Sequence, residues 1–185
     1  MRIVGGELRG RRLNTPRSPA IRPTSDRLRE SLFNILTHGH DEPIPEARVL
    51  DLFAGTGALG LEALSRGAAY ALFIDTSAEA RALIRSNVEQ FGLGGVTRIF
   101  RRDATHLGPR LNPARPYSLV FADPPYGSGL AEQALISART GTWLTPDALI
   151  VVEEAVRAFK VPKGFVQVER RTYDDSELTF LRLGV

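Results

Sequence analysis

The segment VLDLFAGTGALG at residues 49–60 decides the fold of this 185-residue chain. A short apolar run leads into a glycine-rich turn of the form G-x-G-x-x-G, and a helical pattern begins at Ala58. Glycines at these positions let the backbone turn tightly and approach a bound nucleotide closely. A strand, a tight turn and a helix in this order predict one unit of a parallel sheet that binds a nucleotide-like cofactor at its carboxyl edge.

The alternation of apolar runs and helical patterns continues along the chain. Strands are expected at residues 48–53, 70–75, 97–101, 117–122 and 149–153, and helices at residues 58–66, 78–91 and 130–138. This alternation is typical of a parallel sheet covered by helices. Two further β-rich runs, at residues 164–172 and 177–183, flank a turn at residues 173–176 and predict a hairpin. The fold class is therefore α/β, with a mostly parallel seven-stranded sheet that ends in an antiparallel hairpin.

The first 44 residues are expected to form a small extension before a cofactor-binding domain at residues 45–185. Residues 2–14 predict a hairpin built around glycines, and Ser25 predicts the cap of a helix that follows. Residues 1–30 hold eight arginines against three acidic residues, a charge of +5, whereas the remainder carries −2. A basic arm on a slightly acidic body suits contact with a polyanion. A solvated surface with a few ion pairs is the alternative interpretation.

Composition excludes several classes of function. The chain has no cysteine, which excludes disulfides, zinc-thiolate sites and cysteine nucleophiles. It has no apolar run long enough to cross a membrane, and the basic residues 2–12 are not followed by the apolar segment of a signal peptide, so we expect a cytoplasmic protein without a membrane partner. His38, His40 and Asp41 lie in a linker without a third group of ligands, so no metal site is predicted.

Asp51 distinguishes between two cofactors that such a turn could bind. A fixed carboxylate beside the turn would repel the two charges of a dinucleotide pyrophosphate. S-adenosylmethionine carries an ammonium and a sulfonium and no phosphate, so the acid favours this cofactor. Asp75 is placed for the ribose hydroxyls and Asp103 for the adenine amine, although Asp103 could instead cap a turn. The predicted cofactor-binding residues are Asp51, Ala54, Gly55, Gly57, Asp75, Asp103 and Ala104.

The fourth strand ends in Asp123-Pro124-Pro125-Tyr126, which we interpret as the catalytic turn. Two consecutive prolines stiffen the backbone and remove two donors, so neighbouring carbonyls remain as acceptors. Asp123 and the Pro124 carbonyl can each accept one N–H of a planar exocyclic amine, while Tyr126 stacks on the ring. Two such acceptors draw the nitrogen toward tetrahedral geometry and localise its lone pair. A stiff β-turn without chemistry is the alternative.

These segments resemble a known family. Residues 49–67 and 123–126 look like the binding and catalytic motifs of amino-methyltransferases, and nearly the whole chain resembles the bacterial 16S rRNA guanine-N2 methyltransferases of the RsmD type, which have a Rossmann-like class I methyltransferase fold. The discriminating matches are GGELRGRRL at residues 5–13 and RPTSDRLRESLFN at residues 22–34. The resemblance implies that the N-terminal hairpin and helix present substrate-facing residues beside the Asp123 turn. The predicted RNA-binding residues are Arg9, Arg11, Arg12, Arg22 and Thr24.

The resemblance therefore implies methyl transfer from S-adenosylmethionine to the N2 amine of a guanine in 16S rRNA. The expected partner is 16S rRNA or the small ribosomal subunit, and no obligate protein partner is evident. A DNA amino-methyltransferase that acts on adenine N6 or cytosine N4 is the alternative, because the same acceptor turn serves any of these amines. Such enzymes usually need an added target-recognition region, and here only the short arm is available. An NAD-dependent oxidoreductase is disfavoured by Asp51.

Overall fold

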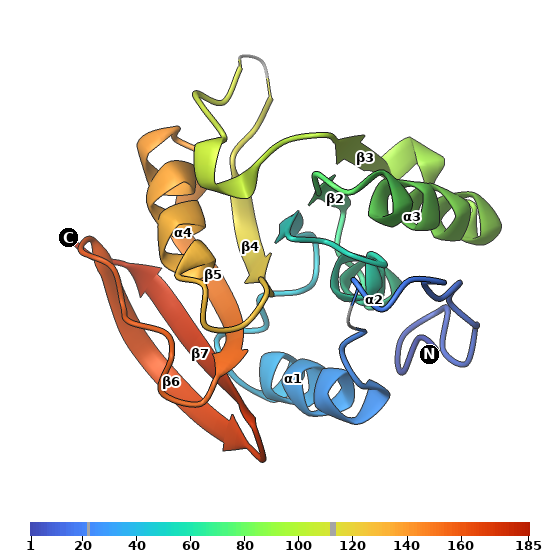
Figure 1. The fold of residues 1–185 in the computed structure, drawn as a ribbon, viewed down its shortest axis with the longest axis horizontal. Coiled ribbons are helices and arrows are strands. Elements are labelled where there is room, and N and C mark those ends of the chain that lie inside the picture. Colours follow the sequence, from blue (N-terminus) through green and yellow to red (C-terminus); the bar gives the residue numbers. More distant parts are fainter. Residues whose placement is uncertain (22, 112–113) are drawn as a thin grey trace.

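The computed structural model describes residues 1–21, 23–111 and 114–185 (Figure 1). Its strands are β1 (Arg48–Leu52), β2 (Tyr70–Ile74), β3 (Thr97–Phe100), β4 (Tyr117–Ala122), β5 (Leu144–Ala155), β6 (Phe165–Tyr173) and β7 (Ser176–Leu183). Its helices are α1 (Asp26–His38), α2 (Ala58–Ser65), α3 (Ala78–Phe91) and α4 (Leu130–Thr140), with short 3-10 helices η1 (Gly94–Val96) and η2 (Ala104–His106).

The strands form one sheet in the order β3-β2-β1-β4-β5-β7-β6. The first five strands in this order pair in parallel, whereas β7 runs antiparallel to both β5 and β6. The prediction of a mostly parallel seven-stranded sheet with a closing antiparallel hairpin is confirmed. The strand order proceeds outward in opposite directions from β1 and from β4, so the boundary between these two parallel strands is the switch point at which open α/β sheets bind their ligands.

Most predicted element ends lie within two residues of the observed ones, and two differences have a clear cause. Strand β5 begins at Leu144, earlier than predicted, because Leu144 pairs with Tyr117 before the register shifts ahead of Leu119. The final turn is tighter than the predicted residues 173–176, because Tyr173 and Ser176 pair directly across it.

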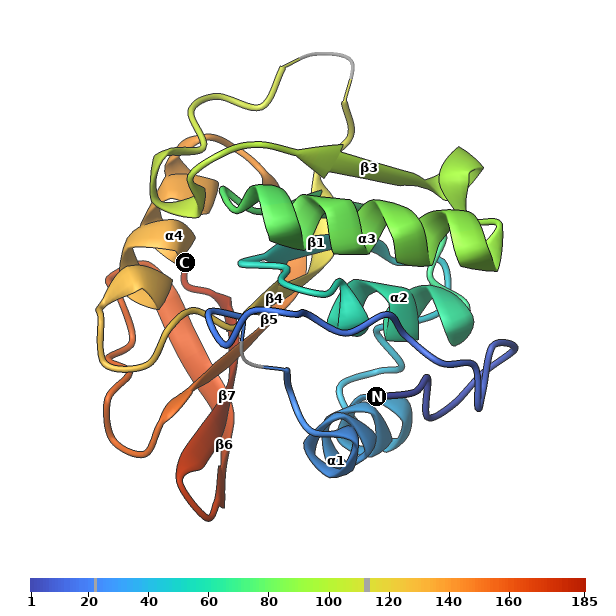
Figure 2. The same cartoon turned by 45° about the vertical axis from the view of Figure 1, so that its right-hand side comes forward.

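Helices cover both faces of the sheet (Figures 1 and 2). On one face, apolar side chains of α1, α2 and α3 pack against alternate strand residues that include Val49 and Phe121. On the other face, α4 and Trp143 pack against the intervening positions, which include Leu50 and Val120. Each face of the sheet therefore has its own apolar core, and each fully buried Leu or Phe side chain in it contributes roughly 1.5–3 kcal/mol to folding.

The N-terminal segment forms the small hairpin that the sequence predicts, in an irregular form. Within the described residues, Arg2 and Arg12 form an antiparallel bridge, the Ile3 amide donates to the Arg11 carbonyl over 2.9 Å, and the Gly10 amide donates to the Ile3 carbonyl over 2.8 Å. The bend of this hairpin contacts α2. The amide of Glu7 donates to the Ser65 carbonyl over 2.8 Å, and a Cβ added at Gly6 would lie only 1.9 Å from that oxygen. The hairpin is therefore short and irregular, and its bend packs closely against the end of α2.

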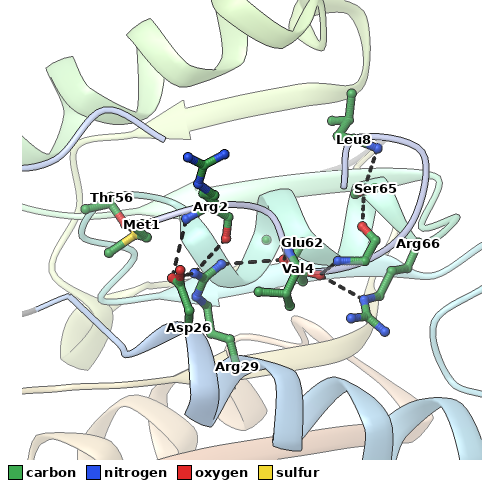
Figure 3. A network of polar contacts seen from close by, with 12 residues as sticks. Met1, Arg2, Val4, Leu8, Asp26, Arg29, Thr56, Glu62, Ser65 and Arg66 are labelled. Carbon is green, nitrogen blue, oxygen red and sulfur yellow. Dashed lines mark hydrogen bonds and ion pairs between the residues drawn. The ribbon is translucent and has the colours of Figure 1, made fainter. Parts of the chain in front are cut away.

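A buried ionic network fastens this segment to the domain (Figure 3). The fully buried carboxylate of Glu62 accepts the amides of Val4 and Gly5 over 2.9 and 2.8 Å, and it also pairs with Arg66 over 2.9 Å and Arg29 over 3.5 Å. The N-terminal segment thus covers the outer side of α2, which explains why every residue of that helix is buried.

Candidate active site

The carboxyl ends of the central strands surround a cavity of about 690 Å³. Of the seven predicted cofactor-binding residues, only Gly57 does not line it. The six that do are Asp51, Ala54, Gly55, Asp75, Asp103 and Ala104. The predicted catalytic residues Asp123, Pro124 and Tyr126 line the same cavity, as does Thr24. The structure therefore brings together residues that are up to about a hundred positions apart, and it places them where the sheet topology favours a ligand.

The glycine-rich turn is braced by Asp75. One carboxylate oxygen of Asp75 accepts the amide of Gly55 over 2.9 Å, and the other accepts the amide of Ser77 over 2.8 Å. Gly55 and Gly57 have φ angles of +59° and +79°, in the left-handed region that favours glycine. At Gly57 an added Cβ would meet Ile84 at 3.2 Å, so this glycine serves packing against α3 rather than contact with the cavity.

Asp51 is buried at the base of the cavity, with 1% of its surface exposed. Its carboxylate accepts the amide of Gly60 over 3.0 Å. Burial raises the pKa of the Asp51 carboxyl well above its ordinary value; the bond from Gly60 opposes this shift, and the charge of Asp75 adds to it. A cationic ligand would offset the cost of ionising this group, whereas an anionic ligand would add to it.

Asp103 caps a turn, and its side chain also lines the cavity. It precedes η2 as the capping residue, and one of its oxygens accepts the amide and the hydroxyl of Thr105 over 2.8 and 2.7 Å. These bonds from Thr105 lower the pKa of the exposed Asp103 carboxyl. The side chain still lines the cavity, so it remains an ionised acceptor at the edge of the site.

The Asp123 turn is held from two directions. Asp123 Oδ2 accepts the hydroxyl of Thr24 over 2.9 Å, and Tyr126 donates its hydroxyl to Glu153 Oε1 over 2.6 Å. Glu154 supports the following residue, because its Oε1 accepts the amide of Gly127 over 2.8 Å. Thr24 does not cap α1, since the side chain of Ser25 accepts the amide of Leu28 instead.

Glu153 is a cavity residue that the sequence interpretation did not select. A signal for it was present, because an acidic residue ends the predicted strand at residues 149–153, next to the strand that leads into Asp123. Parallel strands end at one edge of a sheet, so an acid in that position belongs with Asp123. The neighbouring Glu154 points to the opposite face, as alternation along a strand requires.

Arg9, Arg11 and Arg12 lie away from the Asp123 turn, so the hairpin does not adjoin this turn as the resemblance implied, whereas Thr24 does. Arg11 donates to the Gln90 carbonyl over 2.9 Å, and Gln90 donates in turn to the carbonyl of Arg12 over 2.9 Å. Gln90 is near the end of α3, roughly 18 Å from its start at the cavity at 1.5 Å per residue. Arg9 belongs to the same loop, at the end of α2. Arg22 lies outside the described residues.

Residues 14–21 connect these two regions by running along α3 toward the cavity (Figure 2). Asn14 donates its backbone amide to Asn87 Oδ1 over 2.8 Å, and the amides of Arg17 and Ser18 both donate to Glu79 Oε1 over 3.1 Å. The segment then places Ala20 and Ile21 on the cavity wall. The arm therefore reaches the site through Thr24 and its neighbours, whereas Arg9, Arg11 and Arg12 lie toward the far end of α3.

The profile of the family described as Conserved hypothetical protein 95 matches residues 1–182. Over 156 residues the chain is 40% identical to "Ribosomal RNA small subunit methyltransferase D" of Escherichia coli strain K12, a match that covers 84% of this chain and 75% of the relative. The chain belongs to the RsmD family. A further RsmD-family relative, from Haemophilus influenzae, has the same name and is 32% identical over 174 residues, 93% of this chain and 88% of the relative.

A solved structure matches this fold along nearly its whole length. The Escherichia coli protein yhhF superposes with a TM-score of 0.83 at 34% identity, over 99% of this chain and 97% of that one.

In the described part of the chain, none of the helices is both long and apolar enough to span a membrane. The same residues contain no group of three or more His, Cys, Asp or Glu side chains placed to hold a metal ion.

Proposed function

We propose that this protein transfers a methyl group from S-adenosylmethionine to the exocyclic N2 amine of a guanine in 16S rRNA. The observation that carries the proposal is one cavity lined both by Asp51 and Asp75, which suit a cation with ribose hydroxyls, and by Asp123 and Tyr126, which suit an aromatic amine. The names of the relatives, which refer to the small-subunit ribosomal RNA, support rRNA as the substrate.

The residues present fit S-adenosylmethionine. The buried Asp51 favours a cationic ligand for the reason given above, and a carboxylate such as Asp75 has acceptor sites for about four hydrogen bonds, so it can brace Gly55 and also bind ribose hydroxyls. Asp103 would accept the adenine amine. When bound, the cofactor supplies an electrophilic methyl group on its sulfonium. Ala54 and Gly55 would leave room for it against the turn.

The Asp123 turn would prepare the amine. An exocyclic amine is a poor nucleophile because its lone pair is delocalised into the ring. Asp123 and the Pro124 carbonyl would each accept one N–H and localise that lone pair, while Tyr126 holds the ring by stacking. Thr24 would keep the Asp123 carboxylate oriented through its bond to Oδ2.

Nucleoside analysis tests this function directly. Small ribosomal subunits and naked 16S rRNA from a strain without its own enzyme of this kind would be incubated with the protein and labelled S-adenosylmethionine, digested and separated by mass spectrometry. We expect N2-methylguanosine, and its loss with Asp123→Ala by about a hundredfold or more at unchanged cofactor affinity. Double-stranded DNA is tested in parallel as a substrate, and methylated adenine or cytosine in that DNA would favour the DNA alternative.

A further inference from the structure

A second carboxylate, that of Glu153, faces the same cavity as Asp123. Its position follows from the pairing of β4 with β5, in which Phe121 lies opposite Val151. Glu153 lies two residues further along β5, and Asp123 follows directly after the end of the adjacent parallel strand β4, at a strand spacing of about 4.8 Å. Because side chains alternate along a strand, Glu153 emerges on the face of Val151, against which α1 packs, and Asp123 lines the same cavity.

Glu153 is also tied to the residue assigned to base stacking. Its Oε1 accepts the Tyr126 hydroxyl over 2.6 Å, and only 7% of Glu153 is exposed. A base that stacks on Tyr126 with its amine at Asp123 would therefore present its edge to a buried carboxylate. A carboxylate has acceptor sites for about four hydrogen bonds, so Glu153 can hold Tyr126 and still accept an N–H from a substrate.

The bases that carry an exocyclic amine differ in the ring atom beside it. Guanine has a ring N–H at N1 next to its N2 amine. Adenine N6 and cytosine N4 are each flanked by a ring nitrogen with a lone pair instead. An ionised carboxylate accepts hydrogen bonds and donates none, so it pairs with N1–H and repels a lone pair. In a buried site the mismatched pair has no water to compensate it.

We propose that Glu153 selects guanine by accepting its N1–H while Asp123 holds the N2 amine. The inference rests on the proposed function, because it requires a base in this cavity with its amine at Asp123. Glu153 is then a specificity-determining residue that contacts the substrate, and the Tyr126 hydroxyl fixes its carboxylate. Sites built to hydrogen-bond a substrate N–H reject analogues that lack it by factors on the order of 10⁴.

A substrate analogue tests the contact without altering the protein. The small subunit would be reconstituted with 16S rRNA that carries either guanine or 2-aminopurine at the methylated position, joined from synthetic RNA. 2-Aminopurine keeps the amine at C2 and has a bare N1. We expect the wild-type protein to methylate guanine with a kcat/KM at least about a hundredfold higher. Equal kcat/KM values for the two bases would overturn the inference, whether or not any variant folds.

Glu153→Gln supplies the complementary test. The amide can donate to a bare N1, so the ratio of kcat/KM for guanine to that for 2-aminopurine should fall at least tenfold, as expected of a changed donor pattern. The missing O6 of 2-aminopurine is common to both proteins and cancels in this comparison. Glu154→Gln is the matched control, because Glu154 faces Gly127 on the other side of the strand and should leave the ratio unchanged.

The outcomes separate this inference from the proposed function. If N2-methylguanosine forms and the ratio of kcat/KM for guanine to that for 2-aminopurine is the same in wild type and Glu153→Gln, only the role of Glu153 is overturned. A wild-type product on adenine or cytosine overturns the proposed function and this inference together. A purely structural Glu153 would lower turnover on both bases equally, which also contradicts the proposal.

Discussion

The hydroxyl of Thr24 donates to Oδ2 of Asp123 over 2.9 Å, and this bond joins the N-terminal segment to the Asp123 turn. Thr24→Val keeps the shape of the side chain and removes the donor. We expect turnover at saturating rRNA to fall about tenfold or more, since a hydrogen bond to a charged group is worth roughly 1.5–3 kcal/mol. Calorimetry should show unchanged affinity for S-adenosylmethionine.

Thr24→Ser is the control for this prediction, because it keeps the hydroxyl and should keep most of the turnover. The thermal midpoint of Thr24→Val should stay close to that of the wild type, because Ser25 and not Thr24 caps α1. A lowered midpoint with full turnover would mean that the bond serves folding and not the reaction.

The cofactor side of the site was predictable from sequence because its residues lie at or just beyond the ends of regular strands. Asp75 and Asp123 directly follow β2 and β4, Asp51 is the last residue but one of β1, and the topology of a parallel sheet brings such ends to one edge. Their roles in binding and catalysis stay predictions. Glu153 ends the strand predicted at residues 149–153, and it was missed because a single acid carries no motif.

The path of the arm across the domain was not predictable, because it depends on polar residues of helices far along the chain. Glu62 and Ser65 sit in a helix whose sequence gives no sign that backbone amides will bind there. Three glycines in a basic segment predicted a hairpin, and a short one is present. Its docking on the end of α2 depends on tertiary contacts that the local turn pattern does not encode.

Asp51→Asn should separate cofactor binding from stability. The amide keeps an acceptor for Gly60 and removes the charge, so affinity for S-adenosylmethionine, measured by calorimetry, should fall at least about tenfold. The pKa of Asp51 is raised by burial above its unfolded value near 3.8. Between those two values the folded protein holds a proton that the unfolded chain has lost, so the wild-type free energy of unfolding falls as pH rises.

The pH dependence gives this prediction its sign. Asp51→Asn has no such proton, so its stability relative to the wild type should grow as pH rises above the unfolded value and level off above the raised pKa. Denaturant unfolding across that range without cofactor measures it. A variant that becomes less stable than the wild type toward neutral pH would show that the buried carboxylate is paired favourably and is not poised for a cation.

Glu62→Gln tests the anchoring network. The change replaces a carboxylate that pairs with the fully buried Arg29 and accepts two backbone amides by a neutral amide. Breaking a buried pair typically costs roughly 3–5 kcal/mol, and we expect a loss toward the lower end because Asp26 also contacts Arg29. Urea unfolding gives the value. Glu89→Gln, the same change at an exposed position of α3, should shift stability by less than about 0.5 kcal/mol.

The final prediction concerns the arm arginines, which differ in how far their side chains are engaged in packing. Arg11 donates to Gln90 and lies 4.9 Å from the ring centroid of Phe91, so its removal would disturb packing as well as charge. The exposed Arg9 and Arg12 are better probes of phosphate contact. If both bind phosphates, the double variant with Ala should weaken rRNA binding and reduce the slope of log affinity against log salt by about one unit for each contact.

Fluorescence titration of labelled 16S rRNA at several salt concentrations measures that slope. The matched control is the double Ala variant of Arg98 and Arg157, exposed arginines on β3 and after β5 that remove the same charge elsewhere. Cofactor affinity should be unchanged in both proteins, because neither pair lines the cavity. A slope reduced equally by both pairs would show that only net charge matters, and the loop at the end of α2 would then be a solvated surface and not an rRNA-binding site.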